Sequence, residues 1–412
     1  MKSLLVQVLP ICGAIFLTSC SGSNTSTTVQ PENPPTTNET LANPETANPN
    51  SPEYQPAFAG QTRVKGVKTS TAYTVDVLNS GLSKPWAIID MPDGRFLVTS
   101  KEGYFNLVSA DGKTVKKVEG LPEVDDKGQG GLLDVALDPN FASNKMIYWT
   151  YSEPVSGGNH TAVAKGKLST DESKIENPVV IFRATPTYDG DKHFGSRLLF
   201  DNDGHLFVST GERSDIEMRP YAQRQDSYLG KILKITTDGK PAPGNPTISG
   251  WKPQIFATGI RNPQGIAMDE KGQLWDGEMG PKGGDELNLI QPGKNYGWGD
   301  VTYGVEYSGK KINNGTTQKA GTEQPVYYWD PSISMSGMDF YKGNIEEWKN
   351  NLMLGCLSGK KIIRLVIENN KVVGEEWLMA DQNDRIRDVL SSKNGNLYAV
   401  SDSGKLYRIA KK

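Results

Sequence analysis

One short pattern recurs along this chain and constrains its fold more than any other feature: a turn, often Asp-Gly or Asn-Gly, followed by alternating apolar residues. The clear copies are PDGRFLVTS, NDGHLFVSTGE, EKGQLWDGE and KNGNLYAVSDSGKLYRI, and the looser copies are DPNFASNKMIYWTYSE and EEWKNNLMLGCLSGKKIIRL. The six copies start, about 46 to 76 residues apart, near Pro92, Asp138, Asn202, Glu270, Glu346 and Lys393. Strand units repeated at such a spacing are typical of a β-propeller. The pattern therefore predicts an all-β fold, a six-bladed β-propeller with elaborated loops, over two unrelated β-sandwiches.

The composition agrees with many short strands joined by turns. The 412 residues include 44 Gly and 25 Pro, and only 36% are hydrophobic. The formal net charge is −3, from 45 basic and 48 acidic residues. This balance gives no sign of the basic surface that a nucleic-acid partner requires, so we expect no nucleic-acid binding.

The first 20 residues, MKSLLVQVLPICGAIFLTSC, predict a lipoprotein signal peptide. The apolar run is shorter than the roughly 20 residues that a membrane span needs. The ending LTSC resembles a bacterial lipobox, which would place a lipid on Cys20 and anchor the exported protein in the cell envelope, on the periplasmic or cell-surface side. A plain secretory signal is the alternative. If Cys12 is removed and Cys20 is lipidated, Cys356 has no partner for an intrachain disulfide.

Residues 21–70 are rich in Pro, Asn, Thr and Glu and contain few large apolar side chains. Such a segment buries too little surface to offset its ordering entropy, so we expect a disordered tether. The globular domain is then expected over residues 71–412.

The stretch from Gly259 to Gly299 concentrates polar side chains at two points. Arg261 and Asn262 belong to an Arg-Asn-Pro-Gln-Gly turn, which can direct a planar guanidinium and an amide at a planar, oxygen-rich anion. Further on, the Gly280-Pro281 step can turn backbone carbonyls outward beside a pair of carboxylates that includes Glu286. Such oxygens suit calcium, which prefers about six to eight oxygen ligands. A polar loop whose charges are only solvated is the alternative.

Four further side chains are candidates for a binding or catalytic site. His193 lies just before a predicted strand and is the candidate general base among the three histidines, since His160 and His205 have bland explanations as solvated or structural groups. Gln129 lies between glycines that let a ligand approach the backbone. Arg385 and Arg387 are two residues apart and would face the same way on an extended segment, as ligand contacts or as structural ion pairs.

Six collinear motifs resemble the PQQ-dependent sugar dehydrogenases, in particular the periplasmic aldose sugar dehydrogenases. The resemblance covers about residues 81–409, and its motifs are GQGGLLDVALDPNF, KHFGSRLLFDNDGHLFVSTGER, GIRNPQGIAM, GPKGGDELNLIQPGKNYGWGDVTYG, GTEQPVYYWDPSISMSGMDFY and DRIRDV. It implies a six-bladed propeller that holds pyrroloquinoline quinone (PQQ) and Ca²⁺ in its central mouth.

The resemblance also implies a role for each matching residue. His193 would be the catalytic base. The quinone would be held by Gln129, Arg261, Asn262, Arg385 and Arg387. The carbonyls of Gly280 and Pro281 would bind the cofactor calcium, and Glu286 and Tyr296 would belong to a neighbouring calcium site.

The chain departs from the family pattern at two positions. Ser358 stands where family members often have a lysine, with Lys360 as the candidate replacement, and Lys192 precedes the histidine where the soluble glucose dehydrogenases have an acid. The expected activity is oxidation of an aldose at its anomeric carbon to an aldonolactone, with electrons passed to an external acceptor, a quinone or a cytochrome. The alternatives are a calcium-dependent lactonase and a glycan-binding propeller without catalysis.

Overall fold

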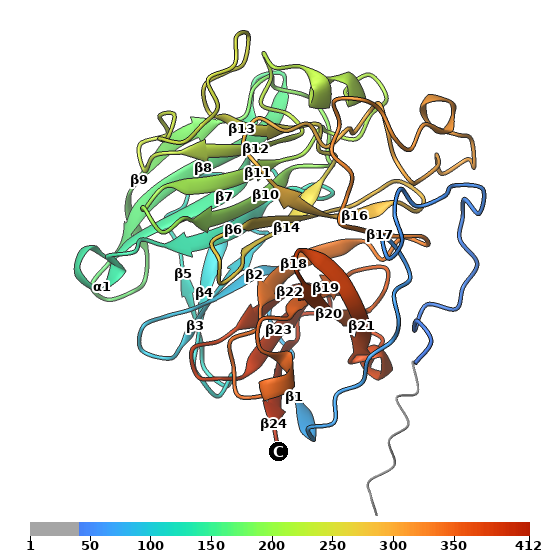
Figure 1. The fold of residues 1–412 in the computed structure, drawn as a ribbon. Helices are drawn as coiled ribbons and strands as arrows, with labels where there is room; N and C mark the ends of the chain where they lie inside the picture. Colours follow the sequence, from blue (N-terminus) through green and yellow to red (C-terminus); the bar gives the residue numbers. More distant parts are fainter. Residues whose placement is uncertain (1–40) are drawn as a thin grey trace, which may run out of the picture. The chain divides into compact units, whose positions relative to one another are not determined.

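Six antiparallel sheets of four strands each make up the part of the chain that the structure, a computed structural model, describes, residues 41–412 (Figure 1). In five sheets the strands follow one another in sequence, as in a propeller blade. The sixth sheet combines the first strand of the propeller with its last three, in the order β1-β24-β23-β22. The predicted six-bladed β-propeller is confirmed.

The strand bounds define the blades. Blade 1 contains β2 (Pro85–Asp90), β3 (Phe96–Ser100), β4 (Tyr104–Val108) and β5 (Val115–Val118). Blade 2 contains β6 (Leu132–Leu137), β7 (Met146–Val155), β8 (Gly158–Leu168) and β9 (Ile175–Arg183). Blade 3 contains β10 (Gly195–Phe200), β11 (Leu206–Thr210), β12 (Lys231–Ile235) and β13 (Ile255–Thr258).

The second half of the ring follows the same plan. Blade 4 contains β14 (Pro263–Met268), β15 (Leu274–Glu278), β16 (Asp285–Ile290) and β17 (Tyr327–Trp329). Blade 5 contains β18 (Met335–Phe340), β19 (Leu352–Cys356), β20 (Lys361–Glu368) and β21 (Lys371–Leu378). Blade 6 contains β22 (Ile386–Ser391), β23 (Leu397–Ser401), β24 (Leu406–Lys411) and β1 (Tyr73–Asn79).

Short helical turns occur only in the connections of this described region. They are α1 (Phe141–Asn144), η1 (Arg219–Gln223), η2 (Asn313–Gly315), η3 (Glu346–Trp348) and η4 (Ala380–Gln382). No helix among residues 41–412 is long and apolar enough to cross a membrane. The predicted signal peptide and Cys20 lie outside the described residues.

Each copy of the repeated turn joins the first and second strands of one blade. In four copies the turn glycine has a positive φ, from 74° to 90°, a backbone conformation in which a Cβ is unfavourable. In the blade 3 copy the Asp201 carboxylate also accepts hydrogen bonds from the backbone N–H groups of Asp203 and His205, at 2.9 and 2.7 Å. The spacing of this turn in the sequence is therefore the spacing of the blades.

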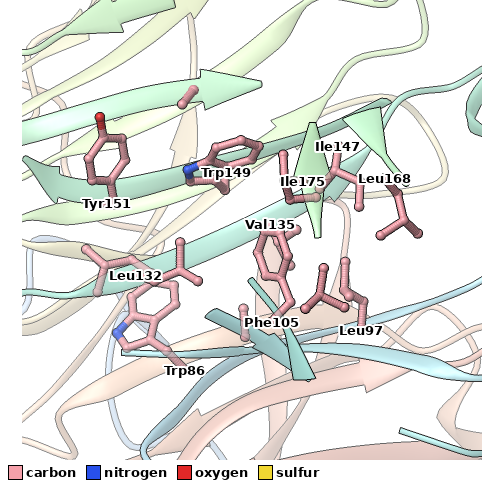
Figure 2. Packing of buried hydrophobic residues seen from close by; sticks show 14 of the residues in the cluster. Trp86, Leu97, Phe105, Leu132, Val135, Ile147, Trp149, Tyr151, Leu168 and Ile175 are labelled. Carbon is pink, nitrogen blue, oxygen red and sulfur yellow. The ribbon is translucent and has the colours of Figure 1, made fainter. Parts of the chain in front are cut away.

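The hydrophobic core is divided among the contacts between neighbouring blades. Figure 2 shows the contact of blades 1 and 2, where Trp86 and Phe105 of one sheet face Leu132 and Trp149 of the other. The rings of Phe105 and Trp149 meet edge to face, with centroids 5.9 Å apart. Comparable clusters fill the other five contacts, so each sheet buries both faces and the six innermost strands close into a ring.

Residues 41–72, which we call the N-terminal arm, differ from the expected tether. The arm, drawn in blue in Figure 1, runs beside β17 and β21 and pairs Gly66 with Glu375. Gln61 of the arm is fully buried, and it donates to the Pro325 carbonyl at 2.9 Å and accepts from the Tyr303 hydroxyl at 3.1 Å. The expectation of a disordered tether over 21–70 is thus corrected for residues 41–70, which dock through polar contacts. The rest of it, residues 21–40, lies outside the described residues.

Candidate functional site

A cavity of about 700 Å³ opens at one end of the ring, where the loops that precede the innermost strands meet. It collects most of the predicted site residues from four blades. Those that line it are Gln129, His193, Arg261, Gly280, Pro281, Arg385 and Arg387. A lining that contains three arginines, together with Lys84, Lys101 and Lys282, and one carboxylate, Asp402, gives the cavity a strongly positive character.

His193 is held in an unusual conformation at the wall of this cavity. Its φ is +51°, in the left-handed region that a non-glycine residue enters at an energetic cost. The Gln129 side chain accepts a hydrogen bond from the His193 backbone N–H at 2.9 Å, and the Arg213 guanidinium donates to the neighbouring Lys192 carbonyl at 3.0 Å. Gly211 leaves room for the turn, since a Cβ there would collide with the His193 carbonyl. Contacts from two segments, Gln129 and residues 211–213, therefore fix the backbone from which the imidazole projects.

The imidazole forms a buried pair with Glu212. The His193 Nδ1 lies 2.8 Å from Glu212 Oε2, and the side chains are 6% and 0% exposed. Burial lowers the pKa of His193, with Arg261 adding to this effect and Glu212 opposing it. Burial alone would raise the pKa of Glu212, but the charge and hydrogen bond of His193 bring it below its usual value. Glu212 thus accepts a hydrogen bond from Nδ1–H, which leaves Nε2 as the basic nitrogen of a neutral imidazole.

Arg261 lies in the wall between this cavity and a small cavity beside it. Its Nη1 donates to the carbonyls of Met279 and Gly280 at 2.9 and 2.7 Å, and its backbone N–H donates to Glu278. The guanidinium lies 5.0 Å from the ring centroid of Trp298. Its Nε is buried and has no hydrogen-bond partner within residues 41–412. A buried donor without a partner in a cavity wall is what an anionic ligand would satisfy.

Arg385 and Arg387 face the cavity together, as their spacing predicts, and they share one carboxylate. Their Nε atoms each lie 2.8 Å from an oxygen of Asp402, and Arg387 also donates to Gln264 at 3.1 Å. The ion pairs that the sequence left open as an alternative are therefore present. They orient the two guanidinium groups toward the cavity that both residues line.

Glu286 and Tyr296 line the small neighbouring cavity, as the resemblance implied. Glu278 and Gly280 line it too, so the carboxylates of Glu278 and Glu286 meet at a cavity with a volume of about 10 Å³. Burial raises the pKa of Glu278 to about 8 and holds the pKa of Glu286 well above its usual value. The Tyr296 hydroxyl is already paired with the Leu289 carbonyl at 2.7 Å, which leaves its backbone carbonyl as the candidate ligand. Buried carboxylates around a one-atom space fit a hard cation.

Two predicted cofactor contacts are not brought to the cavity. Asn262 is fully buried behind the wall, where its Oδ1 accepts a hydrogen bond from the Gly195 backbone at 3.2 Å. Lys360 is exposed, has a positive φ of 51° and is absent from the lining, whereas Ser358 is present there. Lys361 does not replace it, because its amine lies over the Trp377 ring. No lysine of the 358–361 segment therefore reaches this cavity.

Sequence reasoning missed several residues at this site, among them Lys101, Glu212 and Asp402. All three lie just beyond the second strand of a blade. Lys101 and Asp402 directly follow β3 and β23, and Glu212 is separated from β11 by one residue. Since the repeated turn marks the start of that strand, the position just beyond the strand was a usable signal in the sequence.

The residues present fit a planar, oxygen-rich anion with a bound cation. The cavity offers guanidinium groups, the flat ring of Trp86 and a buried Arg261 donor that has no partner in the described part of the chain. The Gly280 and Pro281 carbonyls accept hydrogen bonds from Arg261 and Ser332, at 2.7 and 3.2 Å, and each carbonyl oxygen has a second lone pair for a metal. The donor sets thus match both groups that the resemblance implied.

Comparisons with known proteins extend over nearly the whole propeller. The family model described as Glucose / Sorbosone dehydrogenase matches residues 82–408. The aldose sugar dehydrogenase YliI of Escherichia coli is 41% identical over 345 residues, which cover 82% of this chain and 92% of that protein. The quinoprotein glucose dehydrogenase B of Acinetobacter calcoaceticus is 28% identical and covers 79% of this chain and 85% of its own length.

Two solved structures are similar in three dimensions. The apo form of the soluble aldose sugar dehydrogenase from Escherichia coli superposes with a TM-score of 0.78 at 40% identity, over 83% of this chain and all of that chain. The PQQ-bound aldose sugar dehydrogenase of Streptomyces coelicolor gives a TM-score of 0.68 at 28% identity, over 83% of this chain and 99% of that chain.

Proposed function

This chain belongs to the glucose/sorbosone dehydrogenase family, and we propose that it oxidises aldoses at the anomeric carbon to aldonolactones with PQQ and calcium. The relatives are named as oxidoreductases that act on sugars, and this chain is an enzyme of that class. The electrons would pass to an external acceptor, a quinone or a cytochrome. The observation that carries the proposal is the buried His193–Glu212 pair beside an arginine-lined cavity.

His193 would act as the general base. Its Nε2 would take the proton from the anomeric hydroxyl while Glu212 holds the imidazole orientation and stabilises the imidazolium. General-base help of this kind typically contributes about 10² to 10⁴ in rate. PQQ, when bound with calcium, supplies the two-electron acceptance that the oxidation requires.

Four residues of the cavity would hold the quinone: Gln129, Arg261, Arg385 and Arg387. The arginines would pair with its oxygens, and Arg261 would stabilise negative charge that develops there. Asn262 would act from behind the wall by fixing the start of β10, and Lys360 would have no contact. The Gly280 and Pro281 carbonyls would bind the cofactor calcium, with a second calcium between Glu286 and the Tyr296 carbonyl.

The lactonase alternative is disfavoured by the cavity lining. A calcium-dependent lactonase would need several carboxylates and an Asn on one metal in the main cavity. Asp402 is the one carboxylate that lines this cavity in residues 41–412, and two arginines neutralise it. A glycan-binding propeller without catalysis would leave unexplained why the buried His193–Glu212 pair, unlike the His160–Glu153 pair, lies at the wall of this cavity.

We also propose that the protein is exported and anchored in the bacterial cell envelope by a lipid on Cys20. The sequence motif LTSC supports this proposal. Cys20→Ser should release the protein from the membrane fraction, and retention of the variant there would contradict the lipid anchor.

The cofactor proposal is tested by a thermal-shift matrix with calcium, PQQ, both or neither. If metal and quinone bind as one unit, each raises the affinity for the other by the same factor. Both together should stabilise the folded protein by about 2.7 kcal/mol at a hundredfold excess over the dissociation constant. Arg261→Ala should abolish the gain that needs both ligands, whereas Lys360→Ala should leave it unchanged. A wild type that gains no more from the pair than from calcium alone would contradict the cofactor assignment.

A further inference from the structure

The N-terminal arm passes the main cavity at Asn50. Asn50 of the arm lines that cavity, together with Tyr307 from the loop between β16 and β17. The arm precedes residue 82, where the family match begins, and the whole of the similar Escherichia coli chain is covered by 83% of this chain. Asn50 is therefore a cavity residue that lies outside the part of the chain shared with the family.

A specific clasp holds Asn50 in place. Its backbone N–H and its Nδ2 both donate to Asp330 Oδ1 at 2.8 Å, and the Ser51 backbone N–H donates to Asp330 Oδ2 at 2.9 Å. Arg63 of the arm adds a hydrogen bond to the Asp330 carbonyl at 2.7 Å. Asp330 is only 6% exposed, so its carboxylate depends on these donors from the arm. The position of the arm at the mouth is thus well defined.

The clasp leaves hydrogen-bonding capacity on Asn50 that no group among the described residues satisfies. One N–H of the amide is used by Asp330, and the other N–H and Oδ1 have no partner within residues 41–412. Tyr307 is 74% exposed, an unusual state for an aromatic ring, and its loop is tied to the arm by an ion pair of Lys311 with Glu53. An amide and an exposed aromatic ring that line the same cavity provide the polar and apolar contacts that a sugar ring needs.

The solvent exposure of His193, Asn50 and Tyr307 indicates which part of a substrate each residue would contact. His193 is 5% exposed at the wall, whereas Asn50 is partly exposed and Tyr307 is largely exposed at the mouth. A saccharide with its anomeric carbon at His193 would extend its far end toward the opening. We infer that Asn50 and Tyr307 form a subsite for the second ring of a disaccharide, an inference that rests on the function proposed above.

The test compares glucose and maltose as substrates of the PQQ- and calcium-loaded enzyme with a dye acceptor. Asn50→Ala should raise the KM for maltose by about 3- to 10-fold, the effect of one lost neutral hydrogen bond. The KM for glucose and both kcat values should stay within about twofold, because the subsite contacts neither the first ring nor the reacting atoms. Tyr307→Ala should likewise raise the KM for maltose and leave the KM for glucose nearly unchanged.

Asn43→Ala is the matched control. Asn43 is also in the arm and donates to the Val64 carbonyl, but it does not line the cavity, so its KM values should equal those of wild type. Because Asn50→Ala retains both backbone donors to Asp330, its melting temperature should match that of the control. An unchanged maltose KM, or an equal rise for both sugars, would overturn the subsite while leaving the proposed activity intact. A loaded wild type that oxidises no aldose would overturn both.

Discussion

The two ends of the central channel are built by the same ring of strands but differ in charge and in origin. The end that holds the main cavity, which we call the loop end, is formed by connections that differ from blade to blade. The opposite end, the turn end, is a cavity of about 470 Å³ lined in part by the repeated turns, including Asn202 and Gly272. The cavity at the loop end is lined by six basic residues and one acidic residue. The cavity at the turn end is lined by two basic residues and by five acidic residues, which are Asp134, Asp269, Glu270, Asp339 and Asp388.

Arg197 separates the two cavities. Its guanidinium lies 4.1 Å from the ring centroid of Trp86, which lines the loop end. On its other side it pairs with Asp388 at 3.1 Å and Asp134 at 3.5 Å, which line the turn end. The repeated elements thus close and stabilise the ring, while the connections that depart from the repeat supply the candidate site residues.

The largest expected effect tests whether catalysis belongs to the loop end alone. His193→Gln should lower kcat by about 10² to 10⁴, the loss of a general base, with the two-ligand thermal shift retained. Asp339→Asn, at the turn end, should leave kcat within about twofold of wild type. Dye-linked kinetics with glucose measure both, and a His193→Gln variant within a few-fold of wild type would remove this residue from the mechanism.

A second prediction concerns Arg197, the residue that lies between the two cavities. Arg197→Met leaves Asp134 and Asp388 buried without their cation, which should cost about 3 to 5 kcal/mol of unfolding free energy in urea. Adding Asp134→Asn and Asp388→Asn to the same variant should recover part of the loss, because no charge is then left unpaired. If the single variant is as stable as wild type, the ion pairs are not what closes the channel.

A smaller effect is expected from the partner of the base. Glu212→Gln should lower kcat/KM by less than loss of the base itself, because His193 keeps its Nε2 but loses the carboxylate that orients the ring and stabilises the imidazolium. Since Glu212 raises the pKa of His193, its removal should lower that pKa further and move the acid limb of the pH profile to lower pH.

Glu153→Gln is the control for that variant. Glu153 also pairs with a buried histidine, His160, through Nε2 at 2.7 Å, but neither residue lines the cavity. Its pH profile should match that of wild type. A Glu212→Gln profile that does not move, or that moves to higher pH, would contradict the assigned pair.

The fold was predictable because the repeated turn has a local cause. Its glycine adopts a positive φ and its Asp or Asn side chain bonds to nearby backbone, so the sequence alone carries the signal. Gln129, His193, Arg261 and Arg385 were found for a related reason, since each lies in a connection just before the first strand of a blade.

What could not be predicted depends either on contacts between segments that are separate in the sequence or on a local backbone conformation. Asp402 bonds to residues about one strand pair away, and Lys360 is directed outward by a local left-handed conformation that its sequence does not reveal. The docking of the arm could not be predicted because it depends on hydrogen bonds of Gln61, Asn50 and Arg63. Such polar contacts leave no hydrophobic pattern in the sequence. Composition alone therefore indicated a tether.

The closure of blade 6 by β1 has a consequence for the order in which the chain can fold during synthesis. Tyr73 pairs with Lys411, so the first strand of the propeller waits unpaired while the ribosome makes all the others. Pairing between such distant segments is slow, and an open strand edge can associate with other chains in the meantime. Since the inner ring is complete only when β22 contacts β2, the binding cavity forms late, after the protein has passed through its most aggregation-prone stage.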